Sequence, residues 1–342
     1  MKKKHIIFGV FSMLAILFGS CSTEVDLYAD FKDITIVYGL LDIDNDTNFI
    51  KINRAFLGYG DANEVALIAD SCNYPGKLDC KIIEYRAGMN SETFEKTQEF
   101  PLDTTTIHNK DLGLFYAPDQ LVYYTTGKIR PNTDRYRYRY DLEIDRGDTV
   151  LTASTDVVGG SRFSIVSSVM NFSSYTEYGK LRWLECPNSF IYDVTIKFHY
   201  TEVDHLTNDS VDRCAVWYLG SHPAATTNSD NGIYYINYKS SSFFGSIANE
   251  IGDDTLNFNL ERIFFEPSIE IEIIAGGEEL YNYILVNGSN SSIVQTIPDY
   301  TNIHGGYGVF SSRSKKTARA KMNSQTMMEI LARTNWNFRQ AQ

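Results

Sequence analysis

The sequence is short of basic side chains, with 31 lysines and arginines against 43 aspartates and glutamates, a formal net charge of −12. Proteins that bind nucleic acid need basic patches to displace counterions from phosphates, so this balance argues against a nucleic-acid partner. An acidic body is also repelled by anionic lipid surfaces, so surface charge would not hold it on a membrane. Beyond residue 18 no apolar run is long enough to predict a transmembrane helix.

Histidine is scarce as well, with six in the chain and one of them, His5, in the leader. The sequence contains no Gly-x-Ser-x-Gly, no His-Glu-x-x-His and no phosphate-binding loop. Residues 305–308 are glycine-rich but lack the Lys and Ser/Thr that should follow in a phosphate loop. We therefore expect no enzyme, no catalytic residues and no cofactor. A pair of carboxylates for sugar hydrolysis stays open, because acidic residues are plentiful.

Two groups of residues have the composition of metal sites but the wrong spacing. Asp42, Asp44 and Asp46 alternate as in a calcium loop, yet the glycine and the bidentate acid that an EF-hand requires further on are missing. His199 and His205 lie six residues apart on a predicted strand, about 20 Å at 3.3 Å per residue, too far to share a zinc ion. We expect a solvated hairpin tip and scattered polar residues instead, and no metal.

The first 20 residues have the features of a lipoprotein signal peptide. Residues 2–4 are lysines, residues 6–18 are largely apolar, and Gly19 and Ser20 precede Cys21. An apolar stretch of this length suits a signal peptide and is shorter than a membrane-spanning helix. The pattern is similar to the lipobox, in which the cysteine thiol takes a diacylglycerol, although Phe18 stands where a smaller aliphatic residue is usual. We expect a chain anchored by a lipid on Cys21, since two acyl chains hold firmly.

Without that leader the chain carries 28 basic and 43 acidic side chains, a net charge of −15. Four cysteines remain, and in an oxidising compartment they could form two disulfides in three connectivities. Cys72 and Cys80 bracket a turn-rich segment, Asn-Tyr-Pro-Gly, that could bring them together. Free buried thiols are the alternative for these two and for the other pair, Cys186 and Cys214.

Strict alternation marks the clearest strand, over residues 134–144. Arginine and acidic side chains fall on one face, and tyrosine, leucine and isoleucine fall on the other. Such a period of two predicts an antiparallel strand with one wet face, followed by a turn and a partner strand at 149–155. Further strands are expected at 34–41, 49–56, 81–86, 121–125, 163–170, 180–184, 190–200, 213–219, 232–239, 255–265, 268–274 and 280–286.

Short helices are expected at 242–251, lying on the sheet, and at 324–333, with Ser324 as N-cap. Many short strands with few helices predict a mainly β fold of two antiparallel, immunoglobulin-like β-sandwich domains. We place a signal peptide at 1–20, an N-terminal sandwich domain at 21–156, a glycine-containing linker at 157–161, a C-terminal sandwich domain at 162–312 and an extension with a short helix at 313–342.

Five segments carry a family resemblance: CSTEVDL at 21–27, IVYGLL at 36–41, YRYDLEI at 138–144, VLTAST at 150–155 and DYTNIHGGYGVF at 299–310. Together they resemble a family of uncharacterised Bacteroidota lipoproteins, often encoded beside TonB-dependent outer-membrane receptors. The last block is the most specific, with Thr301 in place of the family's serine. The similarity spans 21–312 and brings no catalytic residues. On physical grounds, the glycines of that block fit a structural role, with Ile303, Tyr307 and Phe310 closing a sandwich.

The resemblance implies an outer-membrane lipoprotein that serves an uptake system as an accessory or ligand-binding partner, with surface exposure slightly favoured. The alternative is a fimbrial or adhesin-like surface subunit, for which a strand-accepting groove would be needed. The tripeptide Arg-Gly-Asp at 146–148 is weak support for adhesion, since Gly-Asp is ordinary turn chemistry. Tyr235 and Phe244, beside a serine-rich turn, are the expected partner or ligand surface, because aromatic side chains suit such contacts.

Overall fold

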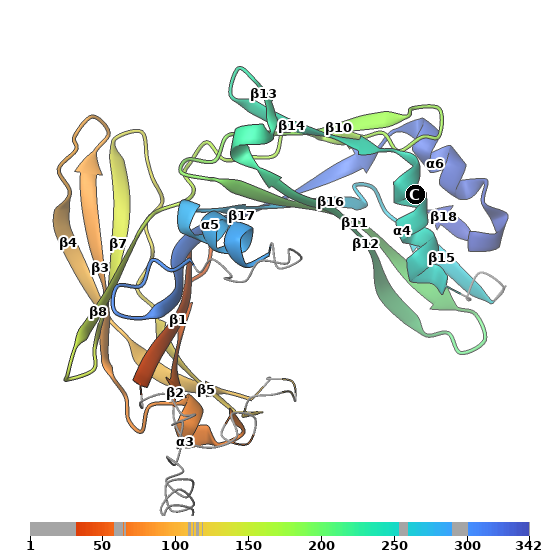
Figure 1. Cartoon of the computed structure of the whole chain (residues 1–342). Helices are drawn as coiled ribbons and strands as arrows, with labels where there is room; N and C mark the ends of the chain where they lie inside the picture. The colour runs from red at the N-terminus through yellow and green to blue at the C-terminus, as the bar shows by residue number, and fades with distance from the viewer. Residues whose placement is uncertain are drawn as a thin grey trace, which may run out of the picture.

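A computed structural model describes residues 32–57, 64, 66–108, 111, 113, 116–117, 119–252, 259–288 and 300–341. The expected signal peptide and Cys21 lie outside these residues. The fold is mainly β and of the β-sandwich type, as the sequence predicts. Figure 1 shows two lobes joined through one long strand, β17, which lies between them.

The first lobe is a sandwich of two sheets. One sheet has the order β4-β3-β7-β8, and the other is the β1-β2-β6-β5 end of a large sheet that continues into the second lobe. Side chains of both sheets form the first core, which includes Val37, Ile50, Ile82, Tyr140 and Leu151. The elements are β1 (Lys32–Asp42), β2 (Asn48–Leu57), α3 (Ala69–Cys72), β3 (Asp79–Gly88), β4 (Glu95–Pro101), β5 (Asp103–Ile107), β6 (Gln120–Thr125), β7 (Tyr136–Asp145) and β8 (Val150–Asp156).

The second lobe packs the rest of the large sheet, β18-β15-β11-β16-β17 with β12 beside β11, against the three-stranded sheet β10-β14-β13 and two helices. The second core, centred on Trp183, Phe198, Phe243 and Ile271, lies between them. The elements are β9 (Val169–Met170), β10 (Tyr178–Leu184), β11 (Ile191–Asp204), β12 (Ser210–Pro223), η1 (Ala224–Thr226), β13 (Asn228–Asp230), β14 (Ile233–Lys239), α4 (Ser241–Ile251), β15 (Leu260–Phe264), β16 (Ile269–Gly276), α5 (Glu278–Asn287), β17 (Tyr307–Met322), α6 (Ser324–Leu331), η3 (Thr334–Trp336) and β18 (Phe338–Gln340).

Strand β17 belongs to both lobes. Its first half runs parallel to β1, with Ile36 opposite Tyr307, and its second half runs antiparallel to β16, with Ile269 opposite Ala320. The expected end of the second domain at residue 312 therefore falls inside a continuous strand. The pattern gave no strand here because the buried positions at its centre are serines and not large apolar residues.

The glycine-rich block before β17 has the structural role expected of it. Gly308 has a φ of +109°, and a Cβ there would lie 2.0 Å from the carbonyl oxygen of Val37, so the chain approaches β1 more closely than any other residue would allow. Ile303 and Phe310 are buried in the first core. Tyr307, by contrast, is 42% exposed, so the expectation that its side chain helps to close the sandwich is wrong.

Four of the five residues of the segment expected as an exposed linker, 157–160, are buried. Val157 and Val158 have no exposed surface, and their backbone groups bond to side chains: Asn132 Nδ2 donates to the Val157 carbonyl at 2.7 Å, and the Val158 amide donates to Ser312 Oγ at 2.8 Å. The paired glycines that suggested a linker serve close packing, since a Cβ on Gly159 would lie 2.5 Å from Ile43.

One expected strand is a helix and another is reduced to two residues. Residues 280–286 form the helix α5, whose first turn carries Glu278 and Glu279, acids that favour a helix N-terminus. The tyrosine, isoleucine and valine residues that follow suggested a strand, yet none of them is buried. Residues 163–170 are strand only at Val169–Met170. Helix α4 begins one residue before the expected start, and α6 is capped by Asn323, which accepts from the Thr326 amide at 3.0 Å, and not by Ser324.

Candidate functional site

The two residues expected to present a binding surface lie in different surroundings. Phe244 is 5% exposed, with the Arg333 guanidinium 4.5 Å from its ring centroid and Trp336 packed beside it, so its expected place on the surface is wrong. Tyr235 is half-buried on β14, with Lys180 Nζ 4.7 Å from its ring centroid. It lines a shallow polar hollow of about 270 Å³ together with His222, Thr226, Thr227, Asn228, Ile236 and Asn237.

The four cysteines of the described chain are free thiols, so the disulfides that the sequence left possible are not formed. Cys80 and Cys186 are buried in different cores, the first and the second, which keeps them apart. Cys72 lies on α3, where its thiol donates to the Ala66 carbonyl at 3.2 Å. Cys214 is on β12, opposite His199 of β11. None of the three disulfide connectivities that the sequence left open is therefore present among these four thiols.

Cys214 and His199 have the residue types of a nucleophile and its base. The thiol lies 4.0 Å from His199 Nε2, and the Glu270 carboxylate lies 3.3 Å from the same nitrogen, so the carboxylate does not orient the ring from its far side. Burial raises the pKa of the Cys214 thiol and lowers the pKa of His199, which favours the neutral form of each. Across the described residues, no group of His, Cys, Asp or Glu side chains could hold a metal ion.

The alternating acids of the β1–β2 turn bind the chain's own basic segment. Asp42 Oδ2 accepts from Arg313 Nε at 2.9 Å, and the Asp44 carboxylate accepts from Ser314 Oγ and Lys316 Nζ, both at 3.0 Å. The spacing that resembles a calcium loop thus fastens the turn to β17. The turn is a hairpin, as expected, but two of its three acids are used in this contact.

The Arg-Gly-Asp tripeptide is at the β7–β8 turn, where the arginine is not presented to a partner. Arg146 Nη2 lies 2.9 Å from Asp148, and Nη1 donates to Thr35 Oγ1 at 3.1 Å. Only 11% of the Arg146 side chain is exposed. An adhesive partner would have to break these contacts before it could reach the guanidinium.

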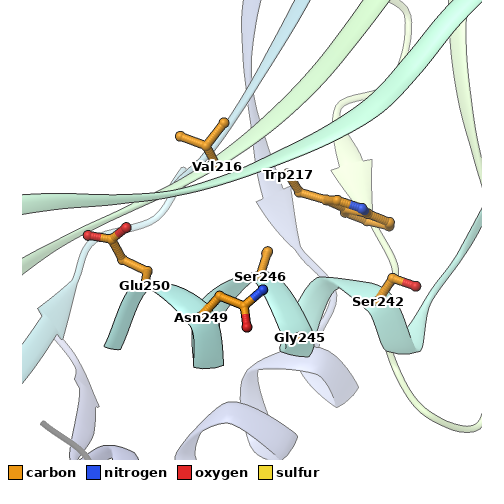
Figure 2. A pocket seen from close by; sticks show the side chains of 7 residues that line it. All are labelled: Val216, Trp217, Ser242, Gly245, Ser246, Asn249 and Glu250. Atoms are coloured by element: carbon orange, nitrogen blue, oxygen red, sulfur yellow. The ribbon is translucent and has the colours of Figure 1, made fainter. Parts of the chain in front are cut away.

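A groove of about 540 Å³ runs between α4 and β12. Figure 2 shows side chains rising from α4 toward the strand, with the Trp217 ring near Ser242 and the Glu250 carboxylate at the other end. The helix contributes positions that recur at i, i+3, i+4, i+7 and i+8, so they share one face, opposite the face that is buried in the second core. The lining residues are Val216, Trp217, Ser242, Gly245, Ser246, Asn249 and Glu250.

The described residues that line the groove are mostly polar, and one of them is charged. Glu250 is the only charged residue of α4, it is exposed, and no ion pair joins it to another described residue. The helix C-terminus at the same end adds the negative end of the backbone dipole. On the strand side, Val216 is 56% exposed and Trp217 is half-buried, with its ring against Phe172 and Tyr238. The groove therefore combines an apolar wall, neutral hydroxyl and amide groups, and an acidic end.

Among the described residues, strand β12, which forms one wall, has a free edge. In the described chain it pairs with β11 alone, over Ser210–Pro223, while β11 pairs with β16 and β15 on its other side. The pairing shifts by one residue after Tyr218, where Gly220 has a φ of +106°, so the regular edge ends near residue 218. Unpaired backbone donors and acceptors on such an edge are a template for another strand.

Sequence reasoning predicted both walls of this groove but not their contact. The strand expected at 213–219 and the helix expected at 242–251 are both present. The backbone CO and NH groups along the edge of β12 cannot be recognised as unpaired until the order of the strands in the sheet is known. The available signal was the face of α4 that carries only small and polar residues.

In the described part of the chain, every helix falls short of the length and apolarity that crossing a bilayer requires. No protein-family model matches this chain, and no curated protein is significantly similar to it.

Proposed function

We propose that this protein is a non-catalytic lipoprotein of the cell envelope, anchored through Cys21 in the outer membrane, that serves a TonB-dependent uptake system as an accessory or ligand-binding partner. The leader and its terminal cysteine support the anchor. The acidic composition gives nucleic acid no electrostatic footprint. Neither metal nor cofactor is part of the proposal.

The observation that carries the binding role is the groove between α4 and the free edge of β12. It offers backbone groups, a half-buried tryptophan and a row of small polar side chains, which are means of recognition. The Cys214–His199 pair has the residue types of a nucleophile and its base, but Glu270 contacts the same imidazole nitrogen as the thiol and does not orient the ring from its far side, which supports a binding role over a catalytic one.

The free edge of β12 is also the structural feature that supports the alternative function, a fimbrial or adhesin-like subunit. A polymerising subunit accepts a strand from its neighbour, and β12 could be the acceptor. The two functions differ in stoichiometry. An accessory protein forms a defined complex with a receptor, whereas a fibre subunit forms a ladder of its own copies that resists dilution.

The test is affinity purification of a tagged chain from detergent-solubilised outer membranes of its own host. We expect one TonB-dependent receptor in fixed ratio with the wild-type chain, none with Cys21→Ala, and a loss with Gly245→Tyr, which fills the groove. Protease treatment of intact cells should remove the protein if it faces outward. Recovery of self-associated chains without a receptor would replace the proposal with the fibre alternative, and recovery of the chain alone would reject both.

A further inference from the structure

We propose that the α4–β12 groove binds an extended, basic peptide segment of the partner, which adds a strand to β12 and places a lysine or arginine at Glu250. This inference rests on the proposed function and names the partner chemistry of the same site. A strand edge on one side and a helix on the other is the arrangement in which peptides add to a sheet, with main-chain hydrogen bonds to the edge and side chains against the helix.

The dimensions of the groove fit a short strand. From Ser242 to Glu250 the helix rises about 12 Å, at 1.5 Å per residue. A strand of about four residues has the same length, at 3.3 Å per residue. The regular edge of β12 from Ser210 to Tyr218 is longer than this, so the backbone of such a peptide could pair along its whole length.

The lining decides what kind of peptide fits. Because successive side chains of a strand alternate, one set would face the helix and the next would face away. The middle of the helix face has no bulk, since Gly245 lacks a side chain and a Cβ there would meet no atom within 4 Å. Small or β-branched side chains can therefore lie against α4, with the Trp217 ring as the apolar contact, whereas the Val216 side chain points away from the helix (Figure 2).

The charge of the site selects a basic segment. Glu250 is the one charge among the lining residues, and it faces the groove without an ion-pair partner in the described chain. The carbonyl groups at the end of α4 add to its potential. An acidic peptide would be repelled by the same carboxylate and by the net charge of the chain, which is −15 without the leader. A lysine or arginine at the Glu250 end complements both.

The experiment uses the purified chain and three labelled octapeptides with blocked ends. The first is Ser-Val-Thr-Val-Lys-Val-Thr-Ser, the second has Glu in place of Lys, and the third has Pro in place of both Thr, which removes backbone donors. Binding is measured by fluorescence anisotropy, and hydrogen exchange reports which amides the peptide protects. The variants are Gly245→Tyr, which fills the groove, and Gly245→Ala, its matched control, which leaves the groove open and suits a helix better.

We expect the lysine peptide to bind the wild-type chain and Gly245→Ala, and to bind Gly245→Tyr at least tenfold more weakly. Glu250→Gln should weaken binding about two- to fivefold, the range for one exposed ion pair. Glu250→Lys should make the chain prefer the glutamate peptide, whereas Glu95→Lys, at an exposed position of β4, should not. Amides of β12 before Tyr218 should exchange more slowly with the lysine peptide bound.

Failure to bind, equal binding by Gly245→Tyr, equal binding of the proline peptide, or protection confined to other strands would each overturn the inference. Self-association of the wild-type chain that Gly245→Tyr abolishes would make the occupant a second copy and would overturn it too. If the receptor still co-purifies while the lysine peptide does not bind, only this inference fails. If no receptor co-purifies, the proposed function fails whatever the peptides do.

Discussion

The guanidinium of Arg262 and the carboxylate of Glu202 form an ion pair inside the second lobe, with Nε and Nη2 of Arg262 both 3.0 Å from Oε2. Arg262 has no exposed surface, and its Nη1 donates to the Trp336 carbonyl at 2.9 Å. The pair therefore ties β11 and β15 to the C-terminal turn, at the end of the lobe that also carries α4.

Removal of one partner should destabilise the protein strongly. Arg262→Ala leaves the Glu202 carboxylate with only the more exposed Arg213, 3.4 Å away, and breaking a buried pair costs about 3–5 kcal/mol. The double variant Arg262→Met/Glu202→Leu should recover most of the loss, because apolar groups of similar volume need no partner. Urea unfolding of the single and double variants measures the loss of stability and its recovery. A single variant with wild-type stability would show that water reaches the pair.

Gly308 should be irreplaceable for a reason that is steric and not only conformational. Gly308→Ala places a Cβ 2.0 Å from the Val37 carbonyl oxygen, so β17 would have to move away from β1. The control is Gly147→Ala, which also has a positive φ but open space around its Cβ. We expect a loss of about 1 kcal/mol for the control and more than 3 kcal/mol for Gly308→Ala, from denaturant midpoints. Equal losses would mean that the close approach is relaxed easily.

Phe244 and Tyr235 should differ sharply in their effect on stability. Phe244→Ala removes a ring that is 5% exposed from the second core, which costs about 3–5 kcal/mol. Tyr235→Ala removes a half-buried ring from the hollow beside β14, and its cost should stay below about 1.5 kcal/mol. Thermal unfolding compares the two variants. Similar losses would place Tyr235 in the core as well.

The sequence predicts elements that depend on local residue patterns, and it misses features that depend on contacts between residues distant in the chain. The alternation in β7 predicted its buried face, with Tyr138, Tyr140, Leu142 and Ile144, because one strand with one wet face is a local property. Helix α4 was predictable for the same reason, although one of its four buried residues, Phe244, was expected at the surface. Strand β17 was not, since its buried serines are satisfied by partners distant in sequence, such as the Val158 amide.

Phe244 and the groove illustrate the same limit. The serine-rich turn beside Phe244 suggested exposure, but Arg333 and Trp336, some 90 residues later in the chain, cover the ring. The groove depends on a strand remaining at the edge of a sheet, which is a property of the sheet order alone. Residue types can predict the walls of such a site, but only tertiary structure brings them together.

The thiols should react in an order that follows their burial. Burial raises the pKa of Cys80 to about 12 and raises that of Cys186 further, so both are protonated and shielded at neutral pH. Cys72 and Cys214 are half-buried, and we expect them to react first with a thiol reagent. In the Cys21→Ala variant, unfolding without reductant should reveal four reactive thiols. Two missing thiols would show that a disulfide forms after all.

The stability of the junction between the lobes should depend on pH through Glu279. Its carboxylate accepts from Ser311 Oγ at 2.8 Å and from Thr155 Oγ1 at 3.0 Å, and it lies where α5 meets β8 and β17. Burial, the largest cause, raises the pKa of this carboxyl above its usual range, and hydrogen bonds from its own backbone amide and from the two hydroxyl groups only partly oppose the shift. The folded state thus holds the proton at a pH where the unfolded chain has lost it.

The free energy of unfolding should therefore fall as pH rises from the ordinary pKa of a glutamate through the raised pKa of Glu279. The contribution is fully present below the ordinary value and is lost above the raised one. Glu279→Gln keeps an acceptor for both hydroxyl groups but cannot ionise, so its advantage over the wild-type chain should grow across this window and then stay constant. Urea unfolding at pH 4 to 8 measures the difference. Glu278→Gln, at an exposed position of the same turn, is the control and should leave the wild-type pH dependence intact. A constant difference between Glu279→Gln and the wild-type chain at every pH would show that the carboxyl is not desolvated by the junction.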